Sequence, residues 1–332
     1  MLSRETAHRT VSEALVRLDD QDLAALLEGA TPLGAGVGGT SASLHVEGVR
    51  VFVKKVPLTD LELRPENVRS TANLFGLPTF FQYGIGSAGF GAWRELAVHE
   101  MTTAWVLNGE HAGFPLMHHW RVLPGSSPTP EEHDDLERTI AFWGGSEGVR
   151  ARFEALRRSP AHLVLFLEHV PRTVHQWLLD RIADGGVDAA IPLVHRELRA
   201  TVDFLRSRGV LHFDAHFNNL LTDGERLYFA DFGLAISSDF DLSPAESDFF
   251  AAHRDYDRCY TVSHLLGWFD RNLDPLPPPA AALARRYRAV ADTIGPYYQQ
   301  LQRPDRDTRY PTAALERAWE LPEGPEPGKV WR

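Results

Sequence analysis

Hydrophobic residues recur at helical spacing near the start of the chain. Val11, Leu15 and Leu18 lie three or four positions apart, and the leucines between residues 23 and 27 repeat the spacing after an acidic pair suited to the start of a helix. We therefore predict one or two short amphipathic helices, and we treat residues 1–30 as an N-terminal helical extension ahead of the main domain.

From residue 31 onwards the pattern becomes typical of strands. A glycine-dense stretch is followed by apolar residues that alternate with others on both sides of Glu47-Gly48, which predicts two strands joined by a turn. Residues 56–92 carry prolines and glycines in irregular order, and we predict a long insertion there. Helical spacing returns at 93–107, and the apolar run 162–168 predicts a strand.

The second half of the chain is mainly helical in pattern. Ile191, Val194 and Leu198 begin an apolar stripe along one face of a helix predicted at 191–208. From Arg303 the chain is rich in Pro, Glu and Arg, and we expect this tail to lie loosely on the surface. Further helices are predicted near residues 175–183, 245–270 and 279–302.

The order of these elements predicts an α+β protein with two unequal parts. The first part, 31–169, is rich in strands and contains the insertion at about 56–92. The second part, 170–302, is mainly helical, and residues 303–332 form the tail. Separate runs of strands and helices, rather than strict alternation, are typical of the α+β class.

Composition and charge exclude several classes of function. The formal net charge is −11, from 34 Lys and Arg against 45 Asp and Glu, so the chain lacks the basic surface that nucleic acids and anionic lipids require. No apolar run approaches the roughly 20 residues needed to span a bilayer, and the N-terminus has no hydrophobic segment of a secretory signal. Cys259 is the only cysteine, which excludes an internal disulfide. We expect a cytoplasmic protein that binds neither nucleic acid nor a membrane.

The segment 211–235 contains the most informative arrangement of polar residues. Apolar runs on both sides of Asp223-Gly224 predict a tight hairpin, and its closure would bring Asn219 and Asp231 together at the open end. Amide and carboxylate oxygens are ligands that Mg²⁺ accepts, with nucleotide phosphates completing its coordination. Asp214, in the loop just before the hairpin, would then face an acceptor hydroxyl.

In these residues the chain resembles the protein-kinase superfamily. His212-Phe213-Asp214, Asn219 and Asp231-Phe232-Gly233 match the signature H-x-D-x-x-x-x-N followed by D-F-G. The resemblance implies a two-lobed protein-kinase-like fold that uses ATP and Mg²⁺, with Asp214 as the catalytic base and Asn219 and Asp231 as metal ligands. It also implies that Asp257 holds the backbone of the loop that carries Asp214.

The glycines upstream fit a loop over the phosphates of ATP. Gly34, Gly36 and Gly39 satisfy G-x-G-x-x-G, a pattern that dinucleotide-binding folds share. A dinucleotide site needs a helix after the glycines, whereas a strand-forming run follows them here. Missing side chains let backbone N–H groups approach an anion, so we expect a glycine-rich flap.

The strand after this flap resembles the V-A-I-K pattern and supplies a lysine. Lys54 fits the register and would bind the α- and β-phosphates, whereas Lys55 lies on the opposite face of the strand and remains the alternative. An active kinase pairs this lysine with a glutamate on a helix. Glu95 and Glu100 are both candidates on the helix predicted at 93–107, and we favour Glu95.

The apolar run at 163–170 resembles the segment that binds adenine in kinases. Leu167 would lie at the back of the nucleotide site, with Glu168 and Val170 offering backbone groups to adenine. An ordinary buried strand has the same pattern, so this interpretation depends on the motifs elsewhere in the chain.

Two positions favour a small-molecule acceptor. Position 213 is Phe where regulated protein kinases carry Arg, and His216 completes a D-x-H-x-x-N run similar to that of aminoglycoside phosphotransferases and choline-kinase-like enzymes. Four acidic residues follow, and if they line the acceptor site they would favour a cationic substrate, although a solvated acidic loop fits equally well. They are Asp239, Asp241, Glu246 and Asp248.

Two other functions stay open. A protein serine/threonine kinase would use the same motifs, because the acceptor is recognised by loops outside them. A pseudokinase would bind nucleotide without catalysis, but its usual mark is the loss of the lysine, the catalytic aspartate or the metal-binding aspartate. Lys54, Asp214 and Asp231 are all present in this chain.

Overall fold

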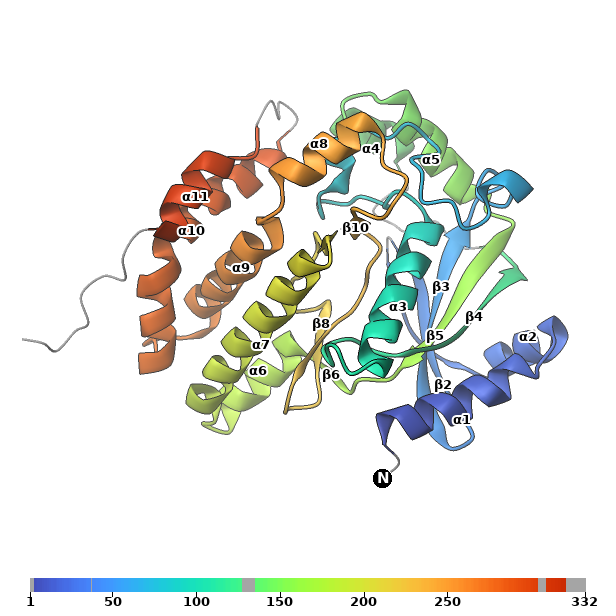
Figure 1. The fold of residues 1–332 in the computed structure, drawn as a ribbon, viewed down its shortest axis with the longest axis horizontal. Helices are drawn as coiled ribbons and strands as arrows, with labels where there is room; N and C mark the ends of the chain where they lie inside the picture. Colours follow the sequence, from blue (N-terminus) through green and yellow to red (C-terminus); the bar gives the residue numbers. More distant parts are fainter. Residues whose placement is uncertain (1–2, 37, 127–134, 304–308, 321–332) are drawn as a thin grey trace, which may run out of the picture.

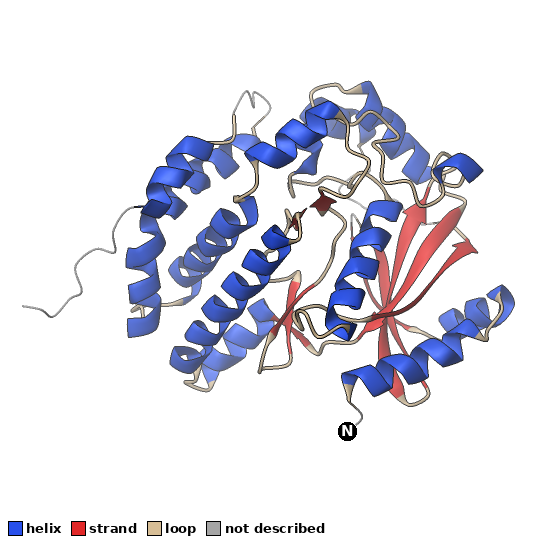
Figure 2. Ribbon diagram, in the orientation of Figure 1, coloured by secondary structure: helices blue, strands red, loops and turns tan. Residues whose placement is uncertain are grey.

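The structure is a computed structural model that describes residues 3–36, 38–126, 135–303 and 309–320. It is an α+β protein in which a five-stranded antiparallel sheet lies on one side and most helices lie on the other (Figures 1 and 2). The predicted α+β class is therefore confirmed. None of the helices formed by the described residues is both long enough and apolar enough to cross a bilayer.

Two helices precede the sheet, as predicted. Helix α1 (Arg4–Val16) begins after Ser3, whose side chain accepts a hydrogen bond from the N–H of Thr6, and α2 (Asp20–Glu28) begins after Asp19, which caps it in the same way. Their apolar faces are buried against the sheet, so the extension is part of the main body of the protein. The residues of this cluster include Val11, Leu15, Leu23, Val53 and Phe166.

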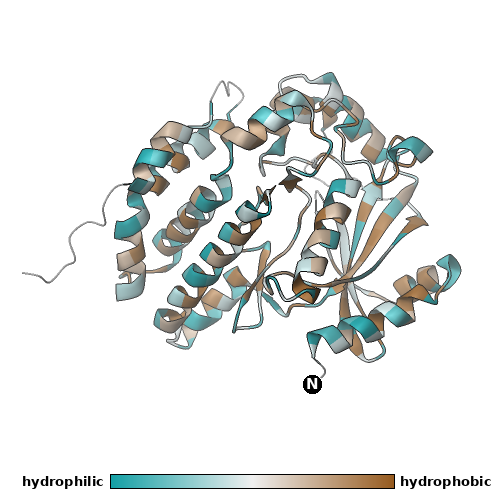
Figure 3. Ribbon diagram, in the orientation of Figure 1, coloured by the Kyte–Doolittle hydropathy of each residue, from teal (hydrophilic) through white to brown (hydrophobic). Residues whose placement is uncertain are grey.

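The main sheet has the strand order β1-β2-β3-β5-β4. The predicted turn between β2 and β3 is present: Glu47 and Gly48 both have positive φ angles, 50° and 75°, as a tight two-residue hairpin turn requires. Figure 3 shows hydrophobic residues concentrated in the strands, while the outer helices carry both kinds of residue. The strands are β1 (Thr31–Gly36), β2 (Gly39–Val46), β3 (Val49–Leu58), β4 (Met117–Pro124) and β5 (Ala161–Glu168).

Helix α3 (Ala92–Leu107) lies between the sheet and the helical part of the molecule (Figure 1). Trp93 and Leu96 pack against apolar residues of β3, β4 and β5. Val98 belongs instead to the large core of the helical part, which it shares with Phe114. A helix that is buried on two faces is held in one orientation by both halves of the protein.

The predicted insertion is irregular but not loose. Strand β3 continues to Leu58, so the prediction was wrong for its first residues, and residues 59–91 form only the short 3₁₀ turns η1 (Pro65–Asn67) and η2 (Thr79–Gln82). Phe81 is fully buried in a cluster with residues of α4 (Leu136–Phe142) and α5 (Glu147–Arg157), two helices that the sequence analysis did not predict. Tyr83 is buried in the helical core.

The helical part follows the predicted pattern with one correction. The tail was predicted to lie loosely, but part of it forms α11 (Thr312–Glu320), which buries Leu315 and Ala318 against the helical core. The indole N–H of Trp319 donates to Sγ of Cys259 at 3.1 Å. The other helices are α6 (Val174–Ala183), α7 (Val187–Ser207), α8 (Pro244–Ala252), α9 (Tyr256–Asn272) and α10 (Pro278–Leu301).

Short strands fill the space between the sheet and the helices. The predicted hairpin is present: β8 (Leu220–Thr222) pairs with β9 (Leu227–Phe229), with Leu220 opposite Phe229. The loop that carries Asp214 follows β7, and the loop that carries Asp231 follows β9. The remaining short strands are β6 (Arg172–Thr173), β7 (Val210–Leu211) and β10 (Ile236–Ser237).

Candidate active site

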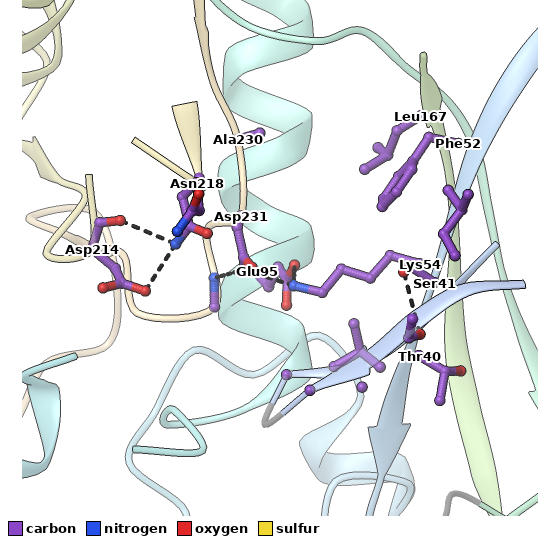
Figure 4. Close-up of a pocket in the computed structure, with 18 of the residues that line it drawn as sticks. Thr40, Ser41, Phe52, Lys54, Glu95, Leu167, Asp214, Asn218, Ala230 and Asp231 are labelled. Atoms are coloured by element: carbon purple, nitrogen blue, oxygen red, sulfur yellow. Dashed lines mark hydrogen bonds and ion pairs between the residues drawn. The ribbon is translucent and has the colours of Figure 1, made fainter. Parts of the chain in front are cut away.

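A cavity of about 760 Å³ is lined by residues from the glycine loop, β3, α3, β5 and the β8–β9 hairpin. Figure 4 shows Lys54 reaching from the sheet towards Glu95 and Asp231, with Asp214 further along. The residues predicted from the sequence to act in catalysis or to bind nucleotide or metal all line this cavity: Gly34, Gly36, Gly39, Lys54, Glu95, Glu168, Val170, Asp214, Asn219 and Asp231.

The ammonium group of Lys54 joins two carboxylates. Its Nζ lies 2.6 Å from Oε1 of Glu95 and 2.7 Å from Oδ1 of Asp231. Burial acts to lower the pKa of Lys54, but the charges of Asp231 and Glu95 outweigh it, so its pKa is raised above the usual value. Lys54 is therefore positively charged at neutral pH.

The two alternatives to this pair lie elsewhere. Lys55 does not line the cavity. Glu100 faces outward and forms an ion pair with Nη2 of Arg69 at 2.6 Å. The contacts thus agree with the preference for Lys54 over Lys55 and for Glu95 over Glu100. His99, one turn after Glu95, is fully buried with its Nε2 3.8 Å from Oε1 of Glu95, and the sequence analysis did not single it out.

Asp257 holds the loop that carries Asp214. Its carboxylate oxygens accept hydrogen bonds from the backbone N–H groups of His212 at 2.6 Å and Phe213 at 2.9 Å. Phe213 has a φ of 64°, an unusual conformation for a large residue that these bonds stabilise. Burial raises the pKa of Asp257 to about 6, although the two backbone donors act in the opposite direction. The contact expected of Asp257 is present.

Asp214 is turned towards Asn219 and His216. Nδ2 of Asn219 donates to the backbone oxygen of Asp214 at 3.1 Å and to its Oδ2 at 2.9 Å, and Nε2 of His216 lies 3.7 Å from the same Oδ2. Burial raises the pKa of Asp214 to about 6, against the lowering effect of His216. A carboxylate that titrates this close to neutrality can accept a proton and release it again.

Asp231 has a strained backbone and a strongly acidic side chain. Its φ is 63°, and the N–H of Gly233 approaches its Oδ1 at 3.5 Å. Burial would raise the pKa of Asp231, but the charge of Lys54 and its hydrogen bond outweigh burial and bring the pKa to about 2. The carboxylate is therefore ionised throughout the physiological range.

The side-chain oxygens of Asn219 and Asp231 are suited to bind a magnesium ion. Each keeps an oxygen, Oδ1 of Asn219 and Oδ2 of Asp231, that accepts no hydrogen bond from any residue described by the structure. The backbone N–H of Ala230 donates to the oxygen of Asn219 at 3.1 Å, which joins the two chain segments at the open end of the hairpin. Within the described ranges, no three His, Cys, Asp or Glu side chains are grouped to hold a metal ion. Mg²⁺ commonly takes one or two protein oxygens together with substrate phosphates.

The glycine loop lies over Lys54. Gly36 is opposite Gly39 where β1 and β2 meet, and a Cβ built on Gly38 would lie 3.4 Å from Nζ of Lys54. Gly39 has a φ of 123°, and a side chain there would overlap the backbone oxygen of Lys55. A Cβ on Gly34 or Gly36 would meet nothing within 4 Å, and both residues line the cavity.

The segment predicted to bind adenine lines the cavity, with a further contact that the sequence did not reveal. The backbone N–H of Glu168 donates to the oxygen of Leu116 at 2.7 Å, so a backbone contact from Glu168 to adenine would use its carbonyl oxygen. The Glu168 carboxylate accepts from Nε and Nη2 of Arg4 at 2.8 and 2.7 Å. The N-terminal helix is thereby tied to the edge of the cavity.

The insertion contributes a wall of the site that the sequence analysis missed. The side chain of Gln82 donates to the backbone oxygen of Leu234. A Cβ on Gly84 would overlap Oδ1 of Asp214, and one on Gly89 would overlap the backbone oxygen of Gly233. The segment 82–91 therefore touches the loops of both predicted motifs. The closely spaced glycines at 84, 86, 89 and 91 were the available signal.

The acidic residues after the hairpin do not line the cavity with Asp214. Glu246 is 2% exposed and forms an ion pair with Arg94, so it neither faces an acceptor site beside Asp214 nor belongs to a solvated loop. Asp239, Asp241 and Asp248 are exposed, which fits the alternative of a solvated acidic loop.

Comparison of the sequence with models of known protein families gives no match, and a search among curated proteins gives none either. Function must therefore be argued from the residues around the cavity and from their chemistry.

Proposed function

We propose that this protein is a kinase-like phosphotransferase that moves the γ-phosphate of ATP to a hydroxyl group of a small molecule. In this proposal residues 31–169 and 170–302 are the two lobes of a protein-kinase-like fold, with the nucleotide between them. The observation that carries it is the position of Lys54, whose ammonium joins Glu95 and Asp231 beneath the glycine loop. The cavity also contains Lys54 and Asp214, whose pKa values are raised, and groups with perturbed pKa values beside charged partners in a cleft are candidates for a functional site.

Each side chain has a place in this reaction. Lys54, kept charged by its partners, binds the α- and β-phosphates, and Glu95 fixes the direction of its side chain. Backbone N–H groups of the glycine loop approach the phosphates from above. Asn219 and Asp231 would hold Mg²⁺, which supplies charge neutralisation at the phosphates when it is bound.

In the transfer step, Asp214 accepts the proton of the acceptor hydroxyl. The acceptor oxygen forms a bond to the γ-phosphorus, the bond from that phosphorus to the β–γ bridging oxygen breaks, and ADP leaves with the electron pair. The hydroxyl proton passes to the Asp214 carboxylate, whose pKa of about 6 suits a base at neutral pH. Asn219, by its hydrogen bond to Oδ2, fixes the direction of that carboxylate.

The insertion supports a small acceptor. Gly84 contacts Asp214 directly, and the hydroxyl of Tyr298 donates to the oxygen of Gly84 at 3.3 Å, so this side of the base is occupied by the protein itself. The Asp214 side chain is 20% exposed, and it borders the cavity beside His216 and Asn218. A compact acceptor can enter there, whereas an extended polypeptide has less room.

The proposal is tested by incubating the protein with ATP, Mg²⁺ and a panel of hydroxylated metabolites and proteins. Mass spectrometry then identifies any acceptor that gains one phosphoryl group, with the Asp231→Asn variant as control. A small-molecule product that is lost in the variant supports the proposal. Products found only among proteins would establish the protein-kinase alternative. Nucleotide binding without turnover would establish a pseudokinase.

A further inference from the structure

Neighbouring residues at the start of α3 make ion pairs with different parts of the protein. Glu95 contacts Lys54, whereas Nη2 of Arg94 lies 2.6 Å from Oε1 of Glu246 in α8. Consecutive residues on a helix are about 100° apart, so the two side chains leave the helix in different directions. Arg94 and Glu95 are each 2% exposed. One turn of α3 thus connects the lysine of the cavity to the helical part of the molecule.

The partner of Arg94 is itself held in place. Oε2 of Glu246 accepts from the backbone N–H of Ser243 at 3.0 Å and from its hydroxyl at 2.8 Å, in the capping box that begins α8. Nε of Arg94 donates to the oxygen of Thr71 at 2.7 Å. The guanidinium group also lies over the ring of Phe240 at 5.5 Å.

A second buried group, Glu62, holds the same end of α3. Oε1 of Glu62 accepts the N–H of Ala92, the first residue of the helix, at 2.9 Å. The indole of Trp93 donates to the backbone oxygen of Glu62, also at 2.9 Å. The three residues before Glu95 each form a hydrogen bond or ion pair with another part of the protein. Glu95 therefore has little freedom to move away from Lys54.

Stability alone is a weak explanation for a fully buried ion pair. Removing two charges from water is costly, and replacement of such a pair by apolar residues is often neutral or stabilising. The side chains of Arg94 and Glu246 are 3% and 2% exposed, so this cost applies fully. The pair does supply a fixed orientation, because Nη2 and Nε of Arg94 reach Glu246 and Thr71 together only when the guanidinium is turned in one direction.

We infer that Arg94 and Glu246 are positioning residues, which hold α3 so that Glu95 meets Lys54. The inference rests on the proposed function in so far as it concerns catalysis. In this arrangement the carboxylate of Glu246 supplies the anion that holds the helix.

The test compares two substitutions with a control of similar cost to stability. Glu246→Gln removes the charge but keeps the size and shape of the side chain, and Arg94→Lys keeps the charge but loses the contact to Thr71. Leu315→Ala, in α11, removes apolar contacts in a buried position (2% exposed) away from the cavity. All three are measured for unfolding by denaturant, so that activity is expressed per folded molecule.

We expect kcat to fall by about tenfold to a hundredfold in Glu246→Gln, because Lys54 loses its orientation. KM for ATP should rise as well, because Lys54 also binds the phosphates, and Arg94→Lys should lie between the wild type and Glu246→Gln in both constants. Leu315→Ala should keep the kcat of the wild type per folded molecule. A kcat that falls only in proportion to the folded fraction, as in the control, would overturn the inference.

Hydrogen exchange gives a readout that does not depend on catalysis. The amides of residues 92–99 should exchange faster in Glu246→Gln than in the wild type, and not faster in Leu315→Ala. If the wild type shows no phosphoryl transfer, the proposed function fails, while faster exchange still supports the positioning role. Unchanged exchange in α3 would overturn the positioning role, whatever the activity.

Discussion

The loop that carries Asp214 and the segment that lies against it are held in place in different ways. Residues 210–237 form short strands joined by backbone hydrogen bonds, and Asp257 fixes the loop through two further backbone groups. The segment from Gln82 to Ala92 contains no helix or strand between these residues and is held by side chains and close glycine contacts. Residues 210–237 fix the positions of the carboxylates of Asp214 and Asp231. The segment from Gln82 to Ala92 limits how closely other atoms approach Asp214.

The largest effect on kcat is expected from a substitution in residues 210–237. Asp214→Asn removes the proposed base but keeps the size of the side chain, and we expect kcat to fall by about 10²- to 10⁴-fold. Nucleotide affinity should be retained, since Lys54 and the glycine loop are unchanged. Steady-state kinetics and a fluorescent nucleotide titration check both parts. Equal loss of binding and turnover would mean that Asp214 has a structural role instead.

A smaller effect on kcat is expected from a substitution in the segment from Gln82 to Ala92. Gly84→Ala adds a methyl group that overlaps Oδ1 of Asp214, so the segment or the carboxylate must move. We expect kcat to fall by about tenfold or more, because displacement of a reacting group by about 1 Å is costly. Gly295→Ala is the matched control, since a Cβ there meets nothing within 4 Å. If both variants keep the activity of the wild type, the segment does not shape the site.

The pH dependence of activity tests whether Asp214 is the base. Burial raises the pKa of Asp214 to about 6, and the proposed base must be ionised. We expect kcat/KM to be constant above this pH and to fall about tenfold per pH unit below it. Lys54 stays charged across the same range because its pKa is raised. A profile that stays flat down to pH 4 would contradict the assignment.

The smallest effect concerns a contact outside both regions. Arg4→Ala removes the ion pair that joins α1 to Glu168. The side chain of Arg4 is about a quarter exposed and that of Glu168 about a fifth. We expect the free energy of unfolding to fall by about 1 kcal/mol or less, as for other pairs that are partly open to water. Arg17→Ala, at a position whose side chain is 77% exposed, should change stability less, and chemical denaturation of both variants compares them.

The two regions also differ in how far the sequence predicts them. The hairpin and its flanking residues could be predicted because turn residues, alternation and spacing are local signals, and Leu220 does lie opposite Phe229. The pair of Lys54 with Glu95 spans 41 positions and was proposed from a motif and a helix pattern. Its catalytic role stays a prediction.

The insertion could not be placed in the same way. Gly84 meets Asp214 only because the chain crosses from the sheet to the helical core, where Tyr83 is buried, and no local pattern encodes that path. The contact of Arg94 with Glu246 spans 152 positions and depends on the same crossing. Helix α11 had a signal, Leu315 and Ala318 three positions apart, but the low apolar content of the tail concealed it.

The most direct test of the account is ³¹P nuclear magnetic resonance of the protein with ATP, Mg²⁺ and an acceptor found by the screen. We expect the γ-phosphate signal of ATP to disappear while ADP and one phosphomonoester appear in equal amounts, and we expect no change with Asp231→Asn. A γ-phosphate signal that persists with the wild type, or transfer that proceeds equally in the variant, would contradict the claim that Lys54, Glu95 and Asp231 form a phosphoryl-transfer site.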